Sequence, residues 1–286
     1  MKNNRAFILT TLSLSTLAIY LFVSAPPPLE EKKDEMHTIP VEVALRIMQQ
    51  QNDVARALYT KEIVGQGTKR GIKFDEEWEE DELHAGPLPA QFLRLTAESL
   101  ERNPVQLGLF LGSDFAINKA NAFEGQQLDM FKKVKQSRQP NFFYVSDAQR
   151  YAYMAPDVAS SKPCVTCHNE HDETPKDDWK LNDVMGATTW TYPKQEIGYK
   201  EMLEMVDALR DGFKEAYTAF LAEAEKMENA PRIGNRWPRN GLYLPDVETF
   251  MIRLNWRSSE KTLRTLVSTT QEENKVPELL AQGEID

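Results

Sequence analysis

Residues 150–190 read RYAYMAPDVASSKPCVTCHNEHDETPKDDWKLNDVMGATTW, and this stretch decides both the fold and the chemistry that we expect. Its far end continues into 184–192, which is rich in β-branched and aromatic side chains and favours a strand. Its near end contributes to a hairpin that we predict for 141–146 and 149–154. Between the strands lies 164–168, CVTCH, which holds the only two cysteines of the chain.

The segment 164–168 has the C-x-x-C-H spacing that is typical of covalent haem c attachment. Two thiols three positions apart can add to the two vinyl groups on one edge of a porphyrin. The adjacent imidazole can then take one axial position on the iron, with its other nitrogen oriented by a backbone carbonyl. We therefore expect one covalent haem c, attached at Cys164 and Cys167, with His168 as the proximal iron ligand.

Three other interpretations of the cysteine pair are weaker. A zinc site needs further soft ligands, and the chain has no third cysteine and only scattered histidines. A thioredoxin-type C-x-x-C usually opens a helix after a strand, whereas Ser160-Ser161-Lys162-Pro163 precedes this one. A simple local disulfide remains the alternative for an exported protein.

The amino terminus predicts export and anchoring. Lys2 and Arg5 precede an uncharged run over 6–25, and twenty residues of helix rise about 30 Å, enough to cross a hydrocarbon core. We expect an uncleaved anchor over 1–25 in a bacterial inner membrane, a stalk over 26–39 and the bulk of the chain in the periplasm. A signal peptide cleaved after Val23-Ser24-Ala25, with release to the periplasm, is the alternative.

The charge balance limits the partners. The 286 residues include 34 Lys and Arg against 44 Asp and Glu, a formal net charge of −10. Nucleic acids and anionic membrane surfaces both require a positive footprint, so neither is expected as the main partner. A redox protein partner would instead present a basic face.

The remaining pattern indicates an α+β fold with no internal repeat. The apolar run over 105–111 predicts a strand, and the chain after about residue 229 reads as irregular with short amphipathic pieces such as 247–256. Helices are predicted over 40–64 (ended by Gly65 and Gly67), 87–102, 123–137 and 196–229.

The sequence around the C-x-x-C-H motif resembles the bacterial c-type haem domain with a PAS-like fold, long catalogued as a domain of unknown function. The resemblance covers about residues 40–195, which leaves 196–286 as a helical C-terminal extension. Shorter matches lie at 56–64 and 87–90. Its specific part is formed by Cys164, Val165, Cys167, His168, Asn169 and His171, followed by Thr174, Pro175, Lys176, Asp178, Trp179, Lys180, Asp183, Val184 and Gly186.

The resemblance implies a PAS-like antiparallel sheet with the haem held against it, and it leaves the second axial ligand open. Some members of the family use a cysteine of the first helix, which this chain lacks. An open site is one alternative. The candidate distal ligands are His84, Met48 and Met154, and the candidate haem surroundings are His171, Arg150 and Lys176.

Three functions follow from these expectations. The resemblance implies a sensor of redox state or of a diatomic gas, as when this domain heads chemoreceptors, kinases or cyclases. The alternatives are a cytochrome-like electron carrier and a haem subunit of a larger membrane complex, with a membrane-protein partner or a homodimer. We do not expect an enzyme, because no second acid–base or metal constellation accompanies the motif.

Overall fold

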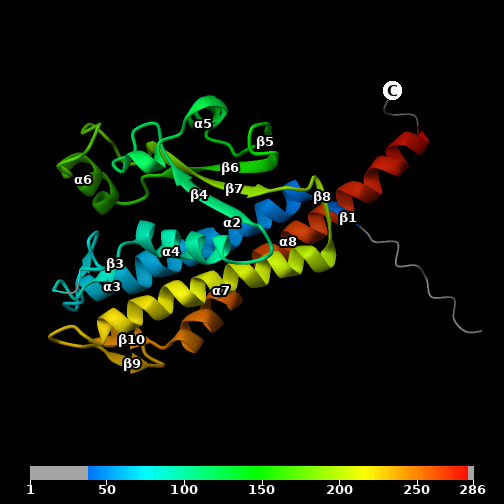
Figure 1. The fold of residues 1–286 in the computed structure, drawn as a ribbon. Coiled ribbons are helices and arrows are strands. Elements are labelled where there is room, and N and C mark those ends of the chain that lie inside the picture. The colour runs from blue at the N-terminus through cyan, green and yellow to red at the C-terminus, as the bar shows by residue number, and fades with distance from the viewer. Residues whose placement is uncertain (1–37, 81, 283–286) are drawn as a thin grey trace, which may run out of the picture. The chain divides into compact units, whose positions relative to one another are not determined.

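The computed structural model describes residues 38–80 and 82–282, and those from Thr38 onward form one compact unit (Figure 1). The predicted anchor over 1–25 and nearly all of the predicted stalk lie outside the described residues. Among the helices that the structure does describe, none combines the length and the apolar character that a membrane crossing needs.

The centre of the fold is a four-stranded antiparallel sheet in the order β4-β7-β6-β5. The strand predicted over 184–192 is confirmed as β7, and the predicted hairpin is confirmed as β5 and β6, whereas the strand predicted over 105–111 begins later, as β4. The bounds are β4 Gly108–Gly112, β5 Asn141–Val145, β6 Arg150–Val158 and β7 Val184–Tyr192. The fold is thus mixed α and β with an antiparallel sheet, as predicted.

Three short strand pairs stand beside this sheet. One is antiparallel, β1 (Thr38–Pro40) with β8 (Glu196–Gly198). Two are parallel and tie loops together: β2 (Phe74–Asp75) with β3 (Gly86–Pro87), and β9 (Arg232–Gly234) with β10 (Tyr243–Pro245). Two single 3₁₀ turns, η2 (Lys119–Asn121) and η3 (Pro238–Asn240), complete the connections.

The two faces of the sheet are covered differently. On one face, helix α5 (Gly125–Ser137) packs over a small cluster that includes Phe131 and Met154. On the other face lie the long helices α2 (Val41–Leu58) and α4 (Pro89–Glu101), and the indole of Trp190 is fully buried against them. Trp190 Nε1 donates to Gln49 Oε1 at 2.7 Å, which joins the sheet to α2 by a buried polar contact.

The first helix runs further than its glycines suggest. We predicted that Gly65 and Gly67 end it, and this is wrong: α2 continues through the π-helix η1 (Tyr59–Val64) into α3 (Gly65–Thr68). A Cβ on Gly67 would lie 3.1 Å from the ring of Phe74, so this glycine serves close packing rather than termination.

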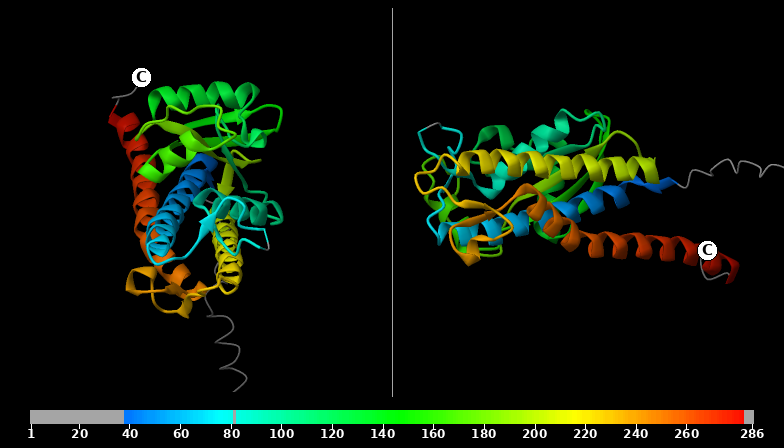
Figure 2. Two further views of the ribbon diagram at one scale, coloured as in Figure 1. Left: turned by 90° about the vertical axis from the view of Figure 1, so that its left-hand side faces the viewer. Right: turned by 90° about the horizontal axis from the view of Figure 1, so that it is seen from below.

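The carboxyl-terminal part is also more regular than predicted. The helix predicted over 196–229 is confirmed as α7 (Tyr199–Ala224), but instead of short pieces the chain after it forms the 36-residue α8 (Val247–Gln282). Asp246 begins α8 by accepting from the Thr249 backbone N–H at 2.8 Å, and the ring of Phe250 stacks on Tyr217 of α7 at 4.0 Å. These helices share the main core with α2 and α4, and in Figure 2 helix α2 lies between α7 and most of α8.

The close approach of β4 to β7 yields a first prediction. A Cβ on Gly186 would lie 2.6 Å from the Gly112 carbonyl oxygen, so Gly186→Ala should push the two strands apart and lower the free energy of unfolding by about 1–3 kcal/mol. Gly234→Ala is the matched control, since its Cβ meets nothing within 4 Å. Urea unfolding followed by circular dichroism measures both; equal stability of the two variants would contradict the prediction.

Candidate functional site

The C-x-x-C-H segment forms a short exposed helix, α6 (Lys162–Glu170), which buries none of its residues. Both cysteines are free thiols: Cys164 is half-buried, with the Ser161 hydroxyl 3.1 Å from its sulfur, and Cys167 is exposed. The local disulfide that remained an alternative is therefore not formed in this structure.

One argument against a thioredoxin-type site does not hold. We expected residues 160–163 to keep the motif away from any junction between a strand and a helix. In the structure β6 ends at Val158 and α6 begins at Lys162, so the motif does lie in the first turn of a helix that follows a strand. Burial, and then the nearby Glu76, raise the pKa of the Cys167 thiol. The histidine that directly follows Cys167 remains the feature that favours haem c attachment over a thioredoxin-type site.

One side of α6 packs against the protein, and the other side carries the residues of the motif. At 3.6 residues per turn, Cys164, Cys167 and His168 lie within an arc of about 100°, and Val165 and Asn169 lie beside that arc. Val165 packs against a small cluster that contains Trp179. The side with Asn169 is thus attached to the protein, while the other carries the three groups that the motif predicts to bind haem.

The attachment of α6 is made by side chain to backbone hydrogen bonds. Asn169 Nδ2 donates to the Trp179 carbonyl at 3.1 Å, and the Trp179 N–H donates to Asn169 Oδ1 at 2.9 Å. Thr174 Oγ1 lies 2.6 Å from the His168 carbonyl and 2.8 Å from that of Lys176, and can donate to either. The loop after the motif therefore folds back and holds the carboxyl end of α6.

The surroundings of His168 favour the neutral form of its imidazole. Burial lowers its pKa, against an opposing effect of Glu76, so the neutral ring persists to lower pH than in an exposed histidine. The same Glu76 lies 3.0 Å from His171 Nε2. Because His171 Nδ1 accepts from the Glu173 N–H at 3.0 Å, its Nε2 carries the proton and donates to Glu76.

A half-buried ion pair lies near the motif. Arg56 of α2 pairs with Asp157 at the end of β6, and the Thr188 hydroxyl donates to the same carboxylate at 3.1 Å. Asp157 is the main cause that raises the pKa of Arg56, and the Cys164 thiol is a weaker one. The end of α2 therefore lies near α6. Arg56 was marked only as the start of the 56–64 match, and Glu76 carried no sequence signal that marked it as part of the site.

The candidate distal ligands lie in three different places. Met48 is fully buried in the main core and Met154 in the cluster under α5, on the other face of the sheet. His84 lies just before β3, with a left-handed backbone (φ 43°) and a buried Nδ1 that has no partner among the described residues. It follows the same loop whose Glu76 contacts His171.

Of the candidate haem surroundings, Arg150 is far from α6. It opens β6, and eight further residues of strand separate it from Val158 by roughly 26 Å. Its guanidinium hydrogen-bonds to Thr191 and to the Gln106 carbonyl. Arg150 therefore ties the far end of the sheet together, and it does not lie beside α6 as its place in the sequence suggested.

Lys176 lies in a pocket behind α6. Its ammonium stands 4.8 Å from the centre of the Trp179 ring and pairs with Asp178. The pocket, of about 390 Å³, is completed by residues that sequence reasoning missed, among them Phe115 and Lys135. Lys135 stands 5.4 Å from the same indole and pairs with Asp114. These residues come from distant segments, so no local pattern marked them.

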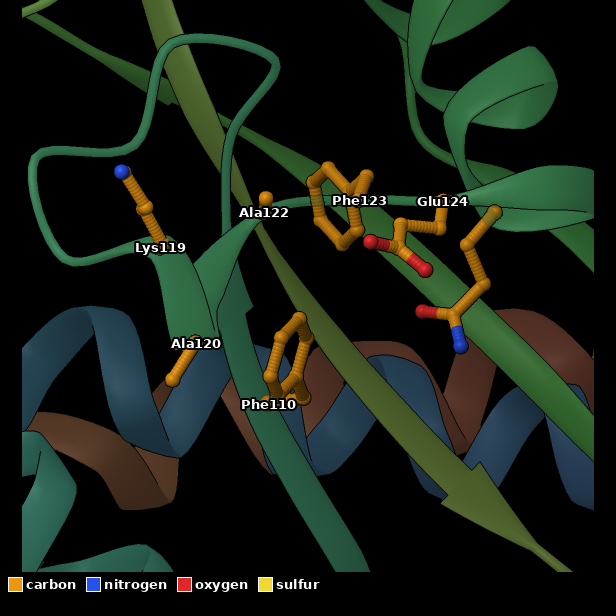
Figure 3. A pocket seen from close by; sticks show the side chains of 7 residues that line it. Phe110, Lys119, Ala120, Ala122, Phe123 and Glu124 are labelled. Carbon is orange, nitrogen blue, oxygen red and sulfur yellow. The ribbon is translucent and has the colours of Figure 1, made fainter.

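A second pocket, of about 340 Å³, lies between β4, η2 and the start of α5 (Figure 3). It is lined by Phe110, Lys119, Phe123 and Glu124 among others, and contains no predicted site residue. Within the described part of the chain, no group of three or more His, Cys, Asp or Glu side chains is arranged to hold a metal ion. The site of interest is therefore α6.

The attachment of α6 yields a second prediction. Asn169→Ala removes both hydrogen bonds to Trp179 and leaves its backbone groups unpaired, so we expect a loss of about 2 kcal/mol in the free energy of unfolding. Asn118→Ala, which removes one exposed side-chain bond to the Ala120 N–H, is the control and should cost less. Thermal unfolding measures the stability of both variants. An Asn169→Ala variant as stable as the wild type would show that the two hydrogen bonds between Asn169 and Trp179 do not hold α6 in place.

One of three comparisons with known proteins assigns this chain to a family. The family model described as Tll0287-like matches residues 41–193, close to the 40–195 that the resemblance covered. No curated protein and no solved structure matches the chain. The match spans more than half of the 286 residues and includes α2, the sheet and α6. The chain is a member of the Tll0287-like family.

Proposed function

We propose that the chain is a membrane-anchored, extracytoplasmic protein that carries one covalent haem c and senses redox state or a diatomic gas through a PAS-like haem domain. The observation that carries this proposal is α6, where Cys164, Cys167 and His168 share one exposed side while Asn169 fixes the helix to the fold. No catalytic role and no nucleic-acid partner is part of the proposal.

The residues present fit a covalent haem. The thiols of Cys164 and Cys167 are free to form thioethers, and α6 buries none of its residues, so a flat macrocycle meets no packed core there. Burial keeps His168 neutral, as an iron ligand must be. When bound, a haem supplies a redox-active iron that can also bind small diatomic molecules.

The contacts around α6 support sensing. The Arg56–Asp157 pair joins the end of β6 to α2. Farther along, Gln51 Nε2 donates to the Thr262 hydroxyl of α8 at 2.9 Å, and Arg257 of α8 pairs with Glu62 at 2.6 Å. Polar contacts therefore connect the end of β6, just before α6, to α8 through α2 and η1. A shift in population between two states could pass along this route to a partner.

Electron transfer is the second candidate function. The exposure of α6 favours it, because a haem edge attached to a surface helix is open to a docking redox protein. The net charge of −10 favours a basic partner and faster encounter with it. The same residues would attach the haem in both functions. The absorption spectra of the haem, and not its attachment, must therefore distinguish sensing from electron transfer.

The distal side carries a prediction of its own. Among the three candidates, His84 alone has a buried ring nitrogen without a partner among the described residues, whereas both methionines pack in cores. We predict that His84→Ala converts the ferric haem from low spin towards high spin, and that Met48→Leu, which conserves side-chain volume, does not. Absorption and electron paramagnetic resonance spectra measure the change. A low-spin spectrum retained in His84→Ala would exclude this ligand.

The experiment that tests the function is optical. The full chain, purified with its haem and reduced, is exposed to carbon monoxide and then to nitric oxide. Rapid formation of ligand-bound spectra supports sensing through an open or labile site. A low-spin spectrum that neither gas changes, together with reversible electrochemistry, supports electron transfer. The mass of the mature amino terminus decides between an anchor and a cleaved signal.

A further inference from the structure

Helix α8 carries an apolar stripe on the side that faces away from the domain. Ile252, Trp256, Leu263 and Val267 are 62%, 76%, 62% and 54% exposed, although each is a large hydrophobic residue. At 100° per residue they fall within an arc of about 60°, nearly opposite the buried Phe250 and Leu254. The four residues therefore lie along one side of the helix, with Ser259 between Trp256 and Leu263, and we call this surface the α8 stripe.

The size of the α8 stripe is that of an interface. At typical side-chain areas, these four residues expose on the order of 500 Å² of apolar surface, at the level where patches on soluble proteins are usually functional. A standard protein interface takes about 800 Å² from each partner, so the stripe and its rim suffice for one copy's share. Trp256 at its centre is the residue type that most often dominates binding energy.

The charges beside the stripe argue against a lipid surface as its occupant. Arg257 already pairs with Glu62 and Arg264 with Glu260, while Arg253 stands 5.0 Å from the ring of Trp237. Two of the three arginines are thus paired with carboxylates of the same chain, and the whole chain carries a net charge of −10. An interfacial membrane helix needs the opposite, a basic face that is available to anionic headgroups.

We propose that the α8 stripe is a homodimer interface, in which α8 of one copy packs in parallel against α8 of a second copy of this chain about a two-fold axis. Glu248 and Arg253 lie on opposite flanks of the stripe, each about 70° from its centre. A parallel pairing brings Glu248 of each copy beside Arg253 of the other, five positions on, as in parallel coiled coils. An antiparallel pairing would instead place Arg253 near the other copy's Arg264.

The first test is a cross-link in the full chain, within the membranes of the expressing bacterium. Leu263→Cys places a thiol beside the two-fold axis, and mild oxidation should then yield a covalent dimer on a non-reducing gel. Leu203→Cys is the matched control, because Leu203 is a leucine of similar exposure (57%) on α7. A dimer yield for Leu263→Cys no greater than for Leu203→Cys would overturn the proposal.

The second test asks whether the stripe holds the dimer. Adding Trp256→Glu to Leu263→Cys should lower the dimer yield more than tenfold, because it introduces two charges into the apolar contact. Adding Leu203→Glu instead should leave the yield unchanged. An unchanged yield with Trp256→Glu overturns the proposal. Trp256 and Leu263 are exposed, so folding should persist, and circular dichroism of each purified full-length variant checks it. Both tests are carried out with the Cys164→Ser/Cys167→Ser substitutions present, so that neither the native thiols nor haem attachment affects the dimer yield.

Discussion

The double substitution Cys164→Ser/Cys167→Ser is expected to remove covalently bound haem from the chain completely. Both thiols are free and stand on one side of α6, and the sequence contains no other cysteine that could form a thioether. A serine hydroxyl does not form the thioether bond to a haem vinyl group. The haem stain of the chain on a denaturing gel, together with the mass of the intact chain, measures the loss.

The single variants and a neighbour sharpen this result. Cys164→Ser and Cys167→Ser each leave one thiol, so each should retain partial attachment through one bond. Ser161→Ala removes the hydroxyl that lies 3.1 Å from the Cys164 sulfur but keeps both thiols, and should retain full attachment. Haem that stays on the double variant after denaturation would show that these cysteines do not attach it.

Much of the fold could be predicted from local pattern. The β-branched run of β7 and the apolar periodicity of α4 and α5 mark elements whose bounds the structure places within about two residues of the prediction. The predictions were wrong where contacts between distant segments determine where a helix ends. Gly67 lies inside a helix because Phe74 packs against it, and α8 is long because its Phe250 side packs on α7. Neither contact is visible in a short window of sequence.

The candidate site divides in the same way. The attachment residues Cys164, Cys167 and His168 are adjacent in sequence, so their spacing alone indicates their chemistry. Their surroundings are not adjacent. Arg56 and Glu76 lie about 90 to 110 positions earlier in the chain. Only the fold brings them near α6, where Arg56 pairs with Asp157 at the end of β6 and Glu76 of the β2–β3 loop contacts His171. Proximity in sequence was also misleading once, for Arg150, which β6 carries to the far end of the sheet.

The second large effect is expected at the iron ligand. His168→Ala should abolish the low-spin spectrum of the haem while the cysteines still hold it, because the neutral imidazole beside Cys167 is the group that the motif assigns to the proximal position. His171→Ala is the matched control. Both nitrogens of His171 are engaged, one by the Glu173 N–H and one by Glu76, so its removal should leave the spectrum unchanged.

Rescue by free imidazole separates a ligand from a residue that merely supports the helix. If His168 ligates the iron, added imidazole should restore the low-spin spectrum of His168→Ala, since the vacated axial position accepts an external ring. If the residue only held α6 in place, imidazole would restore nothing, because Asn169 and Thr174 already anchor the backbone there. A wild-type spectrum in His168→Ala without imidazole would place the proximal ligand elsewhere. A wild-type spectrum in His171→Ala, in contrast, is the expected result and agrees with His168 as the ligand.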